Sequence, residues 1–131
     1  MSPAPDPTTA NTKLMAAFGR AWGKGDVDGI LACVTEDFEW RQAVGPEAPW
    51  GRHVRGKEAL RRALAERDET FANLRYSDNR VEVFGERIVQ TFRISGTLPG
   101  GDPADWRGCD LYQVRDGKLA YKDSYWKRIV R

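Results

Sequence analysis

Apolar residues near the start of the chain recur at the spacing of a helix that buries one face. The stripe consists of Leu14, Met15, Phe18, Ala21 and Trp22. It predicts a helix that runs to about Trp22 and that Thr9 or Asn11 can cap at its start. Residues 23–25, Gly-Lys-Gly, are typical of a helix end. Residues 1–8 carry three prolines and are expected to form a disordered tail ahead of a single domain over residues 9–131.

Two further helices follow from the same kind of pattern. Asp26 can cap a short second helix, whose inward positions are Val27, Ile30, Leu31 and Val34. A third helix is predicted from about Lys57 to Phe71, with its buried side at Ala59, Leu60, Ala63, Leu64 and Phe71. Between these helices, residues 38–41 alternate like a short strand. Residues 43–56 contain glycines and prolines and predict a long loop, of the kind that is often functional.

The second half of the chain alternates apolar and polar residues with a period of two, which predicts strands. The expected strands cover residues 74–84 and 87–97, and residues 106–126 form one hairpin around Asp116-Gly117. Strands joined by hairpins make an antiparallel sheet, and helices gathered on one face of it make an α+β domain. We therefore expect a curved antiparallel sheet, a cone, with three N-terminal helices packed on its concave face.

Two registers are open to the closing hairpin. A two-residue turn at Asp116-Gly117 sets Asp110 opposite Asp123, whereas a three-residue turn that includes Arg115 sets Asp110 opposite Lys122. Like charges directly across a ladder destabilise it, and opposite charges stabilise it by roughly 0.2–1 kcal/mol. We therefore prefer the second register.

Because side chains alternate along a strand, the preferred register gathers an acid and an amine among large aromatic side chains on one face of the hairpin. This face carries Trp106, Asp110, Tyr112, Lys122, Ser124 and Trp126. The opposite face carries Arg107, Cys109, Leu111, Tyr121, Asp123 and Tyr125. The first face is a candidate site.

Composition narrows the class of protein. A chain of 131 residues with 40% hydrophobic and 31% charged content is expected to be one soluble globular domain. A net charge of +2 without a Lys/Arg cluster argues against nucleic-acid binding.

No apolar run approaches the ~18 residues of a membrane span, and the start lacks the pattern of a signal peptide. A single histidine and the absence of a Cys-x-x-Cys motif argue against a metal site. Cys33 and Cys109 are expected to be free thiols, which favours a cytoplasmic location.

Three groups of residues resemble the nuclear transport factor 2-like superfamily, which includes ketosteroid isomerase, limonene epoxide hydrolase, scytalone dehydratase and polyketide cyclases. Residues 25–37, with Gly-Asp-Val-Asp followed by Glu-Asp, are similar to the start of the family's domain, and residues 56–60 to the start of its third helix. Residues 109–119 are similar to its closing hairpin. The resemblance spans about residues 12–128 and implies the cone fold and a homodimer, while the fold itself hosts many functions.

The resemblance also assigns residues. Asp110 falls where ketosteroid isomerase has its oxyanion-hole aspartic acid, a carboxylic acid that an apolar site keeps neutral so that it can donate a hydrogen bond. The isomerase's tyrosine falls at Phe18, which has no hydroxyl, and its base falls at Gln42, which cannot act as one. Lys122 would favour the ionised form of Asp110. Steroid isomerisation is therefore not expected. The resemblance to the polyketide cyclases instead implies that Asp110 can act as a general acid or base.

The candidate catalytic residues are Asp110, Lys122 and His53, the last as a second proton carrier at the mouth of the pocket. The candidate substrate-binding residues are Phe18, Trp22, Trp40, Gln42, Trp106, Ser124 and Trp126. Each also has a plainer structural interpretation. The acid and the amine can be only a buried ion pair, the aromatic residues only a core, and the histidine only an exposed loop residue.

Three functions remain open. The first is a cofactor-independent enzyme of isomerase, cyclase or dehydratase type that acts on a hydrophobic, oxygenated small molecule through Asp110. The second is a non-catalytic binding protein with the same cavity, and the third is an interaction domain. We expect a hydrophobic ligand and a homodimer through the convex sheet face, where Tyr121 and Tyr125 lie and where Asp123 would pair with Arg107 or Arg93.

Overall fold

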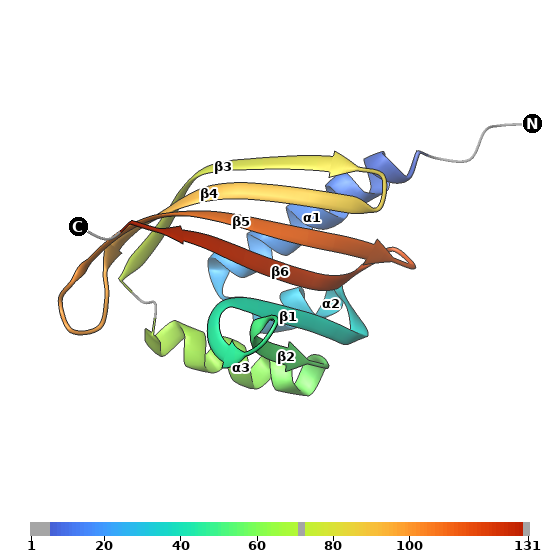
Figure 1. Ribbon diagram of the computed structural model, residues 1–131. Coiled ribbons are helices and arrows are strands. Elements are labelled where there is room, and N and C mark those ends of the chain that lie inside the picture. Colours follow the sequence, from blue (N-terminus) through green and yellow to red (C-terminus); the bar gives the residue numbers. More distant parts are fainter. Residues whose placement is uncertain (1–5, 71–72, 130–131) are drawn as a thin grey trace, which may run out of the picture.

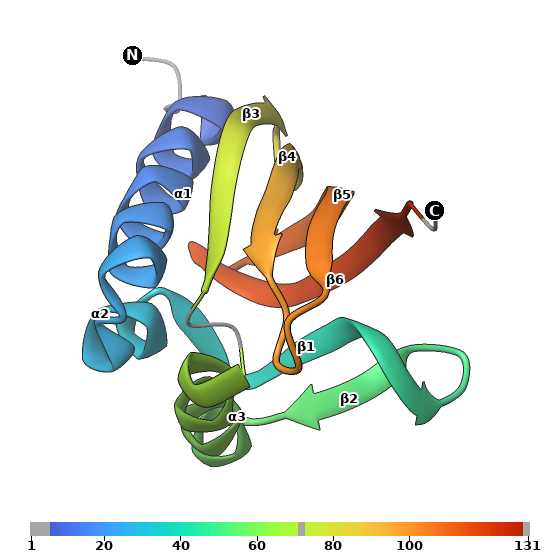
Figure 2. The same ribbon diagram turned by 90° about the vertical axis from the view of Figure 1, so that its left-hand side faces the viewer.

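The computed structural model describes residues 6–70 and 73–129 and has the expected α+β architecture (Figure 1). The elements in chain order are α1 (Pro7–Lys24), α2 (Val27–Ala32), β1 (Val34–Glu47), β2 (Gly51–Arg55), α3 (Lys57–Thr70), β3 (Leu74–Phe84), β4 (Arg87–Thr97), β5 (Pro103–Arg115) and β6 (Lys118–Arg128). The six strands form one sheet in the order β2-β1-β6-β5-β4-β3. Figure 2 shows that the sheet curls and that the helices lie on its inner side.

Neighbouring strands pair antiparallel with one exception. β1 and β6 run parallel, with Trp40 opposite Lys122. A parallel pair needs a long crossover, and here everything from β2 to β5 lies between the two strands in the chain. The expected antiparallel sheet therefore contains one parallel pair, which joins the N-terminal strand to the closing hairpin.

The helix starts follow local capping. Asp6 accepts a hydrogen bond from the backbone N–H of Thr8 at 2.9 Å, and Pro7 occupies the first helical turn, so α1 begins two residues before Thr9. Asp26 caps α2 as predicted, accepting from the N–H of Gly29 at 3.0 Å. The predicted disordered tail covered residues 1–8. Residues 1–5 lie outside the described residues, Asp6 caps α1, and residues 7 and 8 belong to this helix.

The region predicted as a long loop, residues 43–56, is mostly strand. β1 continues to Glu47, and β2 follows from Gly51, so the two strands form a projecting hairpin with a register shift between Gln42 and Glu47. Gly45 and Pro46 lie at the end of β1, beyond its last pairing with β6 at Arg41, and Gly51 begins the edge strand β2, so these residues interrupt no inner ladder. This is why the composition of the segment was misleading.

The closing hairpin has a register that differs from both predicted ones. Asp116 and Gly117 have positive φ angles of 54° and 75°, which identifies a two-residue turn with Arg115 opposite Lys118. The register then shifts at a bulge between Gln113 and Val114, so that Asp110 lies opposite Ser124. The preferred register was wrong, but the predicted face was right. The bulge adds one residue on β6 and restores the alternation that places the acid and the amine on the same side.

The core fills the space between the helices and the concave side of the sheet. Its fully buried members include Phe18, Ile30, Val34, Leu60, Ile88 and Leu119. Cys33 and Cys109 are free thiols, and burial raises the pKa of both, so that both are predominantly protonated at neutral pH. In the described part of the chain, no helix is both long and apolar enough to cross a membrane.

Candidate active site

A cavity of about 530 Å³ lies between α1 and the concave side of the sheet. This volume is within the range typical of small-molecule sites. Its described lining includes seven aromatic side chains, which are Phe18, Trp22, Trp40, Tyr76, Phe92, Tyr112 and Trp126. Trp22 packs edge-on against Trp40, with ring centroids 5.2 Å apart, and is tilted against Phe18 at 5.4 Å. The walls are therefore built from rings that hold one another in place.

A charged pair lies in the wall of this cavity. Nζ of Lys122 donates to Oδ2 of Asp110 at 2.6 Å, and the two side chains are 9% and 2% exposed. The residues are not cross-strand partners, so the lysine reaches diagonally from its position opposite Tyr112. The ammonium also lies 4.5 Å from the ring centroid of Trp22, within the range of a cation–π contact.

Tyr112 connects the pair to the neighbouring strand. Its hydroxyl lies 3.1 Å from Oε1 of Gln90 and 3.4 Å from Oδ2 of Asp110, and it accepts from Nζ of Lys122 at 3.3 Å. Burial raises the pKa of this phenol well above its usual value, and the carboxylate of Asp110 raises it further. Tyr112 therefore stays protonated at neutral pH and can donate a hydrogen bond to the pair or to a ligand.

One atom of the site has no partner. Oδ1 of Asp110 is buried and makes no hydrogen bond to any of the described residues. An unsatisfied buried acceptor costs about 1–3 kcal/mol, more if it is charged, so native proteins hold few of them outside functional sites. Because Asp110 lines the cavity, a bound ligand can supply the partner that this oxygen lacks among the described residues.

The charged groups around the cavity are mostly cationic. Among the described lining residues, Lys24, Arg67 and Lys122 are basic, and Asp110 is the one acid. The guanidinium of Arg67 lies 4.8 Å from the ring centroid of Trp22 and 5.6 Å from that of Tyr76. The local field therefore favours a ligand that carries an acidic group.

The structure brings most of the predicted site residues together. The cavity is lined by Phe18, Trp22, Trp40, Gln42, Asp110, Lys122, Ser124 and Trp126. Trp106 is not among the lining residues. It is 5% exposed in a second core cluster with Phe92 and Ile94, where its ring lies 5.6 Å from that of Trp126. It supports the cavity wall without forming its surface.

His53 is the predicted catalytic residue that the structure places away from the cavity. On β2 it lies opposite Arg41, whereas the neighbouring pair of Trp40 and Val54 points inward, so the histidine projects on the outer face. Its Nε2 lies 2.7 Å from Oε1 of Glu39. The prediction that it sits at the mouth of the pocket rested on a loop that is in fact a strand, in which alternation fixes its direction.

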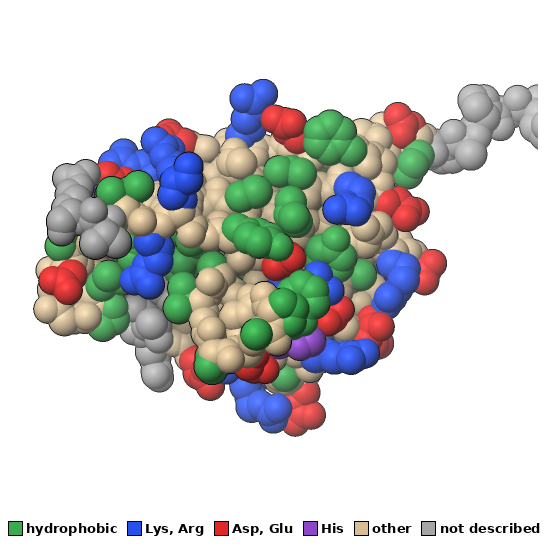
Figure 3. Space-filling model, in the orientation of Figure 1, with side chains coloured by type: hydrophobic (Ala, Val, Ile, Leu, Met, Phe, Trp, Pro, Cys, Tyr) green, Lys and Arg blue, Asp and Glu red, His purple; other side chains and the backbone are tan. Residues whose placement is uncertain are grey.

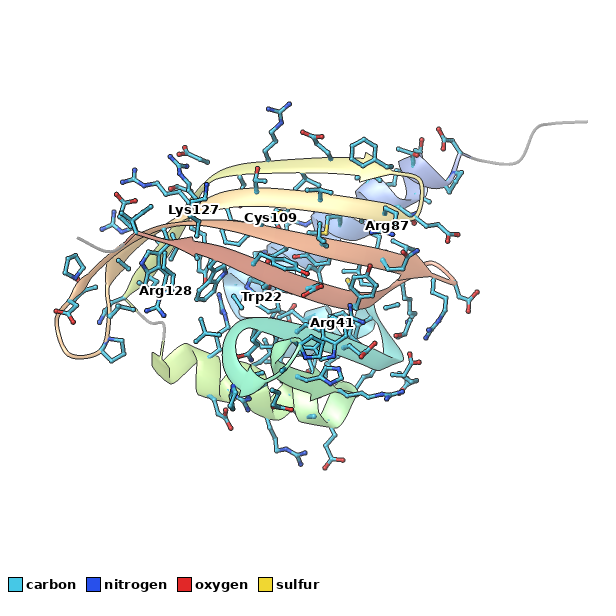
Figure 4. The ribbon with its side chains drawn as sticks, viewed as in Figure 1. Trp22, Arg41, Arg87, Cys109, Lys127 and Arg128 are labelled. Carbon is cyan, nitrogen blue, oxygen red and sulfur yellow. The ribbon has the colours of Figure 1, made fainter. Side chains whose placement is uncertain are left out.

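Asp123 is also placed differently from its prediction. It is 6% exposed, lies 3.7 Å from Nη1 of Arg41, and accepts from the hydroxyl of Tyr125 at 3.1 Å. Arg41 projects on the outer side of β1 while Trp22 lies behind the sheet (Figure 4). Arg93 and Arg107, the predicted partners, pair instead with Asp105 and Asp78. Parallel pairing of β1 with β6, which brings Arg41 opposite Asp123, explains the change.

The outer face of the sheet is partly apolar. Figure 3 shows hydrophobic side chains gathered over the middle of the sheet, with charged groups around them. Tyr125 on this face is 55% exposed. The expectation that a second copy of the chain covers this face stays a prediction.

Several lining residues were not predicted, among them Gln90, Tyr76, Phe92, Asn79 and Arg67. Gln90 had a detectable signal. It lies between Ile88 and Phe92 at the inward positions of a correctly predicted strand, and a polar residue in such a row often faces a ligand. Phe92 has the same inward parity, whereas Tyr76, Asn79 and Arg67 depend on the curl of the sheet and the path of α3, which no local pattern specifies.

Comparisons with known proteins agree on the fold. A family model described as SnoaL-like domain matches residues 15–122. An NTF2-like protein from Burkholderia xenovorans LB400 has 25% sequence identity and a TM-score of 0.74, with 94% of this chain and 93% of that chain covered. A proposed polyketide cyclase from Xanthomonas campestris pv. campestris has 20% identity and a TM-score of 0.76, with 92% and 93% covered. TerC, co-crystallised with polyporic acid, has 22% identity and a TM-score of 0.73, with 90% and 92% covered. No curated protein sequence matches the chain.

Proposed function

Because the chain belongs to the SnoaL-like domain family, within the NTF2-like superfamily, we propose that it is a cofactor-independent enzyme with acid–base chemistry at Asp110. Its substrate is a hydrophobic, oxygenated small molecule, and the reaction is an isomerisation, cyclisation or dehydration. The family alone does not choose among reactions, because one fold hosts many of them. The proposal therefore rests on the residues of the cavity.

The observation that carries the proposal is the buried Oδ1 of Asp110. One carboxylate oxygen is held by Lys122 at 2.6 Å, which fixes the side chain, while the other has no partner among the described residues. A general base must present a lone pair to the substrate within about 2.6–3.2 Å. Oδ1 can accept a proton from a carbon or hydroxyl group of a bound molecule and return it to a neighbouring atom.

Two other groups assist the charge that develops on the substrate. Lys122 balances the carboxylate when Asp110 is ionised, and it becomes the partner of a substrate oxyanion when Asp110 takes up a proton. Tyr112, which its raised pKa keeps protonated, supplies a hydrogen-bond donor without competing for the proton. Fixed donors near developing charge are among the strongest contributions to catalysis.

The ligand class follows from the walls and the charges. Aromatic walls favour flat, conjugated molecules, and three basic side chains against one acid in the described lining favour an acidic ligand. The similarity to a proposed polyketide cyclase, and to a protein co-crystallised with polyporic acid, supports the same class. We therefore propose polyketide-like or other conjugated molecules with an enol, phenol or carboxyl group.

The test measures binding and turnover separately. Quenching of tryptophan fluorescence by 2-naphthol, 1,4-dihydroxy-2-naphthoic acid and hydroxylated quinones reports binding, because Trp22, Trp40 and Trp126 line the cavity. Loss of the α-proton of conjugated ketones, followed by deuterium exchange in D₂O, reports proton transfer. We expect Asp110→Asn to lower the exchange rate by roughly 10²–10⁴-fold.

Asp123→Asn is the matched control. It removes another buried carboxylate of the same hairpin, on the opposite face of the sheet, and should leave exchange unchanged. Equal rates for wild type and Asp110→Asn would refute the proposed chemistry.

One observation favours a second candidate function, a non-catalytic binding protein. Asp110 is the one carboxylate in the described lining, and Phe18 and Gln42 stand where a hydroxyl and a second base would assist. Tight binding of the same ligands without exchange or product formation would support this function.

A further inference from the structure

Lys122 differs from every other lysine of the chain. Of the six lysines, Lys13, Lys24, Lys118 and Lys127 are exposed and Lys57 is partly exposed, whereas the side chain of Lys122 is 9% exposed. It is also in the wall of the cavity, within hydrogen-bond distance of both a carboxylate and a phenol. An amine in these surroundings can do more than balance a charge.

We propose that Lys122 is a nucleophile that forms a Schiff base with the carbonyl carbon of a hydrophobic aldehyde or ketone bound in the cavity. This inference rests on the proposed function to the extent that the cavity must accept such molecules. It adds a covalent activity that acid–base chemistry at Asp110 does not require.

The surroundings of Nζ match the needs of a nucleophilic amine. Such an amine requires a base within hydrogen-bond reach. Oδ2 of Asp110 at 2.6 Å is that base, and the aromatic rings that line the cavity can hold an apolar carbonyl compound beside Nζ.

The proton needed for each step can remain within the pair. The Lys122 ammonium first gives a proton to the Asp110 carboxylate, and the lone pair of the neutral amine then attacks the carbonyl carbon. The carbonyl oxygen takes the proton from Asp110, which gives a carbinolamine with a protonated nitrogen. That nitrogen returns a proton to Asp110. Its lone pair then forms the C=N bond while the C–O bond breaks, and the leaving hydroxyl takes the proton from Asp110 as water.

The products are water and an iminium cation. The iminium carries one positive charge, as the Lys122 ammonium did at the start, and the carboxylate of Asp110 balances it. Charge and atoms are conserved without an oxidant or reductant. Tyr112, 3.3 Å from Nζ, can donate to the oxygen of the carbinolamine. The iminium then withdraws electrons from the adjacent carbon, from which Oδ1 of Asp110 can remove a proton to give an enamine.

The experiment traps the intermediate. The full chain is incubated with 2-naphthaldehyde and sodium cyanoborohydride, which reduces an iminium to a stable secondary amine, and the product is examined by intact mass spectrometry and peptide mapping. We expect one adduct per chain, located at Lys122 in preference to the five other lysines. An excess of 2-naphthol, which has no carbonyl group, should compete and lower the yield.

Variants distinguish chemistry from binding. Lys122→Arg keeps the charge but cannot form the adduct, and Asp110→Asn should slow adduct formation by at least about tenfold at neutral pH, the smaller end of acid–base effects. Adducts spread over exposed lysines with Lys122 unmodified would overturn the inference. Should Lys122→Arg fail to fold, the peptide map of the wild-type protein still decides.

Failure of the inference and failure of the proposed function give different results. If 2-naphthol quenches tryptophan fluorescence but no adduct forms at Lys122, the Schiff base is refuted while the binding cavity stands. If neither 2-naphthol nor 2-naphthaldehyde binds, both proposals fail.

Discussion

Removal of the Lys122 amine should destabilise the fold strongly, because Asp110 would lose its partner in the interior. In Lys122→Met, Oδ2 loses its donor at 2.6 Å and keeps the Tyr112 hydroxyl at 3.4 Å, while Oδ1 already has no partner in the described chain. Removing one member of a buried ion pair costs about 3–5 kcal/mol. This cost applies here because the pair is buried, with 9% of the Lys122 side chain and 2% of the Asp110 side chain exposed. For a domain of this size, the loss corresponds to a fall in Tm of roughly 10–20 °C.

The assay is urea denaturation at pH 7, followed by circular dichroism, together with a thermal scan. Lys127→Met is the control, because this lysine is exposed on the same strand, and it should change the free energy of unfolding by less than about 0.5 kcal/mol. The double variant Asp110→Leu with Lys122→Met should recover at least half of the loss, because an apolar pair leaves no charge without a partner. Equal stabilities for Lys122→Met and Lys127→Met would refute the reasoning.

Three further predictions concern packing, pH and the outer face. Gly108→Ala should lower the free energy of unfolding by about 1–3 kcal/mol, because the added Cβ would clash with the ring of Phe92. Phe92→Leu should relieve the effect in a double variant measured by urea denaturation. The pKa of Tyr112 is raised in the folded state, so the unfolded state releases the phenol proton at a lower pH. The free energy of unfolding should therefore fall as pH rises above about 10. Tyr112→Phe should remove part of this pH dependence in urea denaturation series from pH 8 to 11. His53→Gln should leave the Kd for 2-naphthol unchanged in fluorescence titrations, and a clear weakening would show that the histidine reaches the cavity.

The fold was predictable because its signals are local and repeated. The stripe around Phe18 and the cap at Asp26 identified helices, and the alternation over residues 74–97 identified two strands with correct bounds. The residues of the cavity face were predictable for the same reason, since parity along a strand decides which side chains lie together.

The register of the closing hairpin and the conformation of residues 43–56 could not be predicted, because they depend on strand pairing and a bulge that have no local sequence pattern. The bulge in β6 set the register of Asp110, and strand pairing turned residues 43–56 from a loop into β1 and β2. His53 was misplaced as a consequence, because an isolated histidine in a segment of unknown conformation has no predictable direction. The partners of Asp123 depended on the parallel contact of β1 with β6, a pairing between the two ends of the sheet-forming chain.

The bulge in the closing hairpin also matters for the order of folding events. A hairpin closes within about 1–10 μs and zips away from its turn, here the turn at Asp116-Gly117. If zipping continued without the extra residue, Asp123 would meet Asp110 and Lys122 would point outward, since a slip of one residue exchanges the two faces. The repulsion of two carboxylates raises the free energy of that misaligned hairpin, whereas the native alignment ends with the acid beside the amine. The pair in the cavity wall therefore also favours the native alignment of the hairpin over the slipped one.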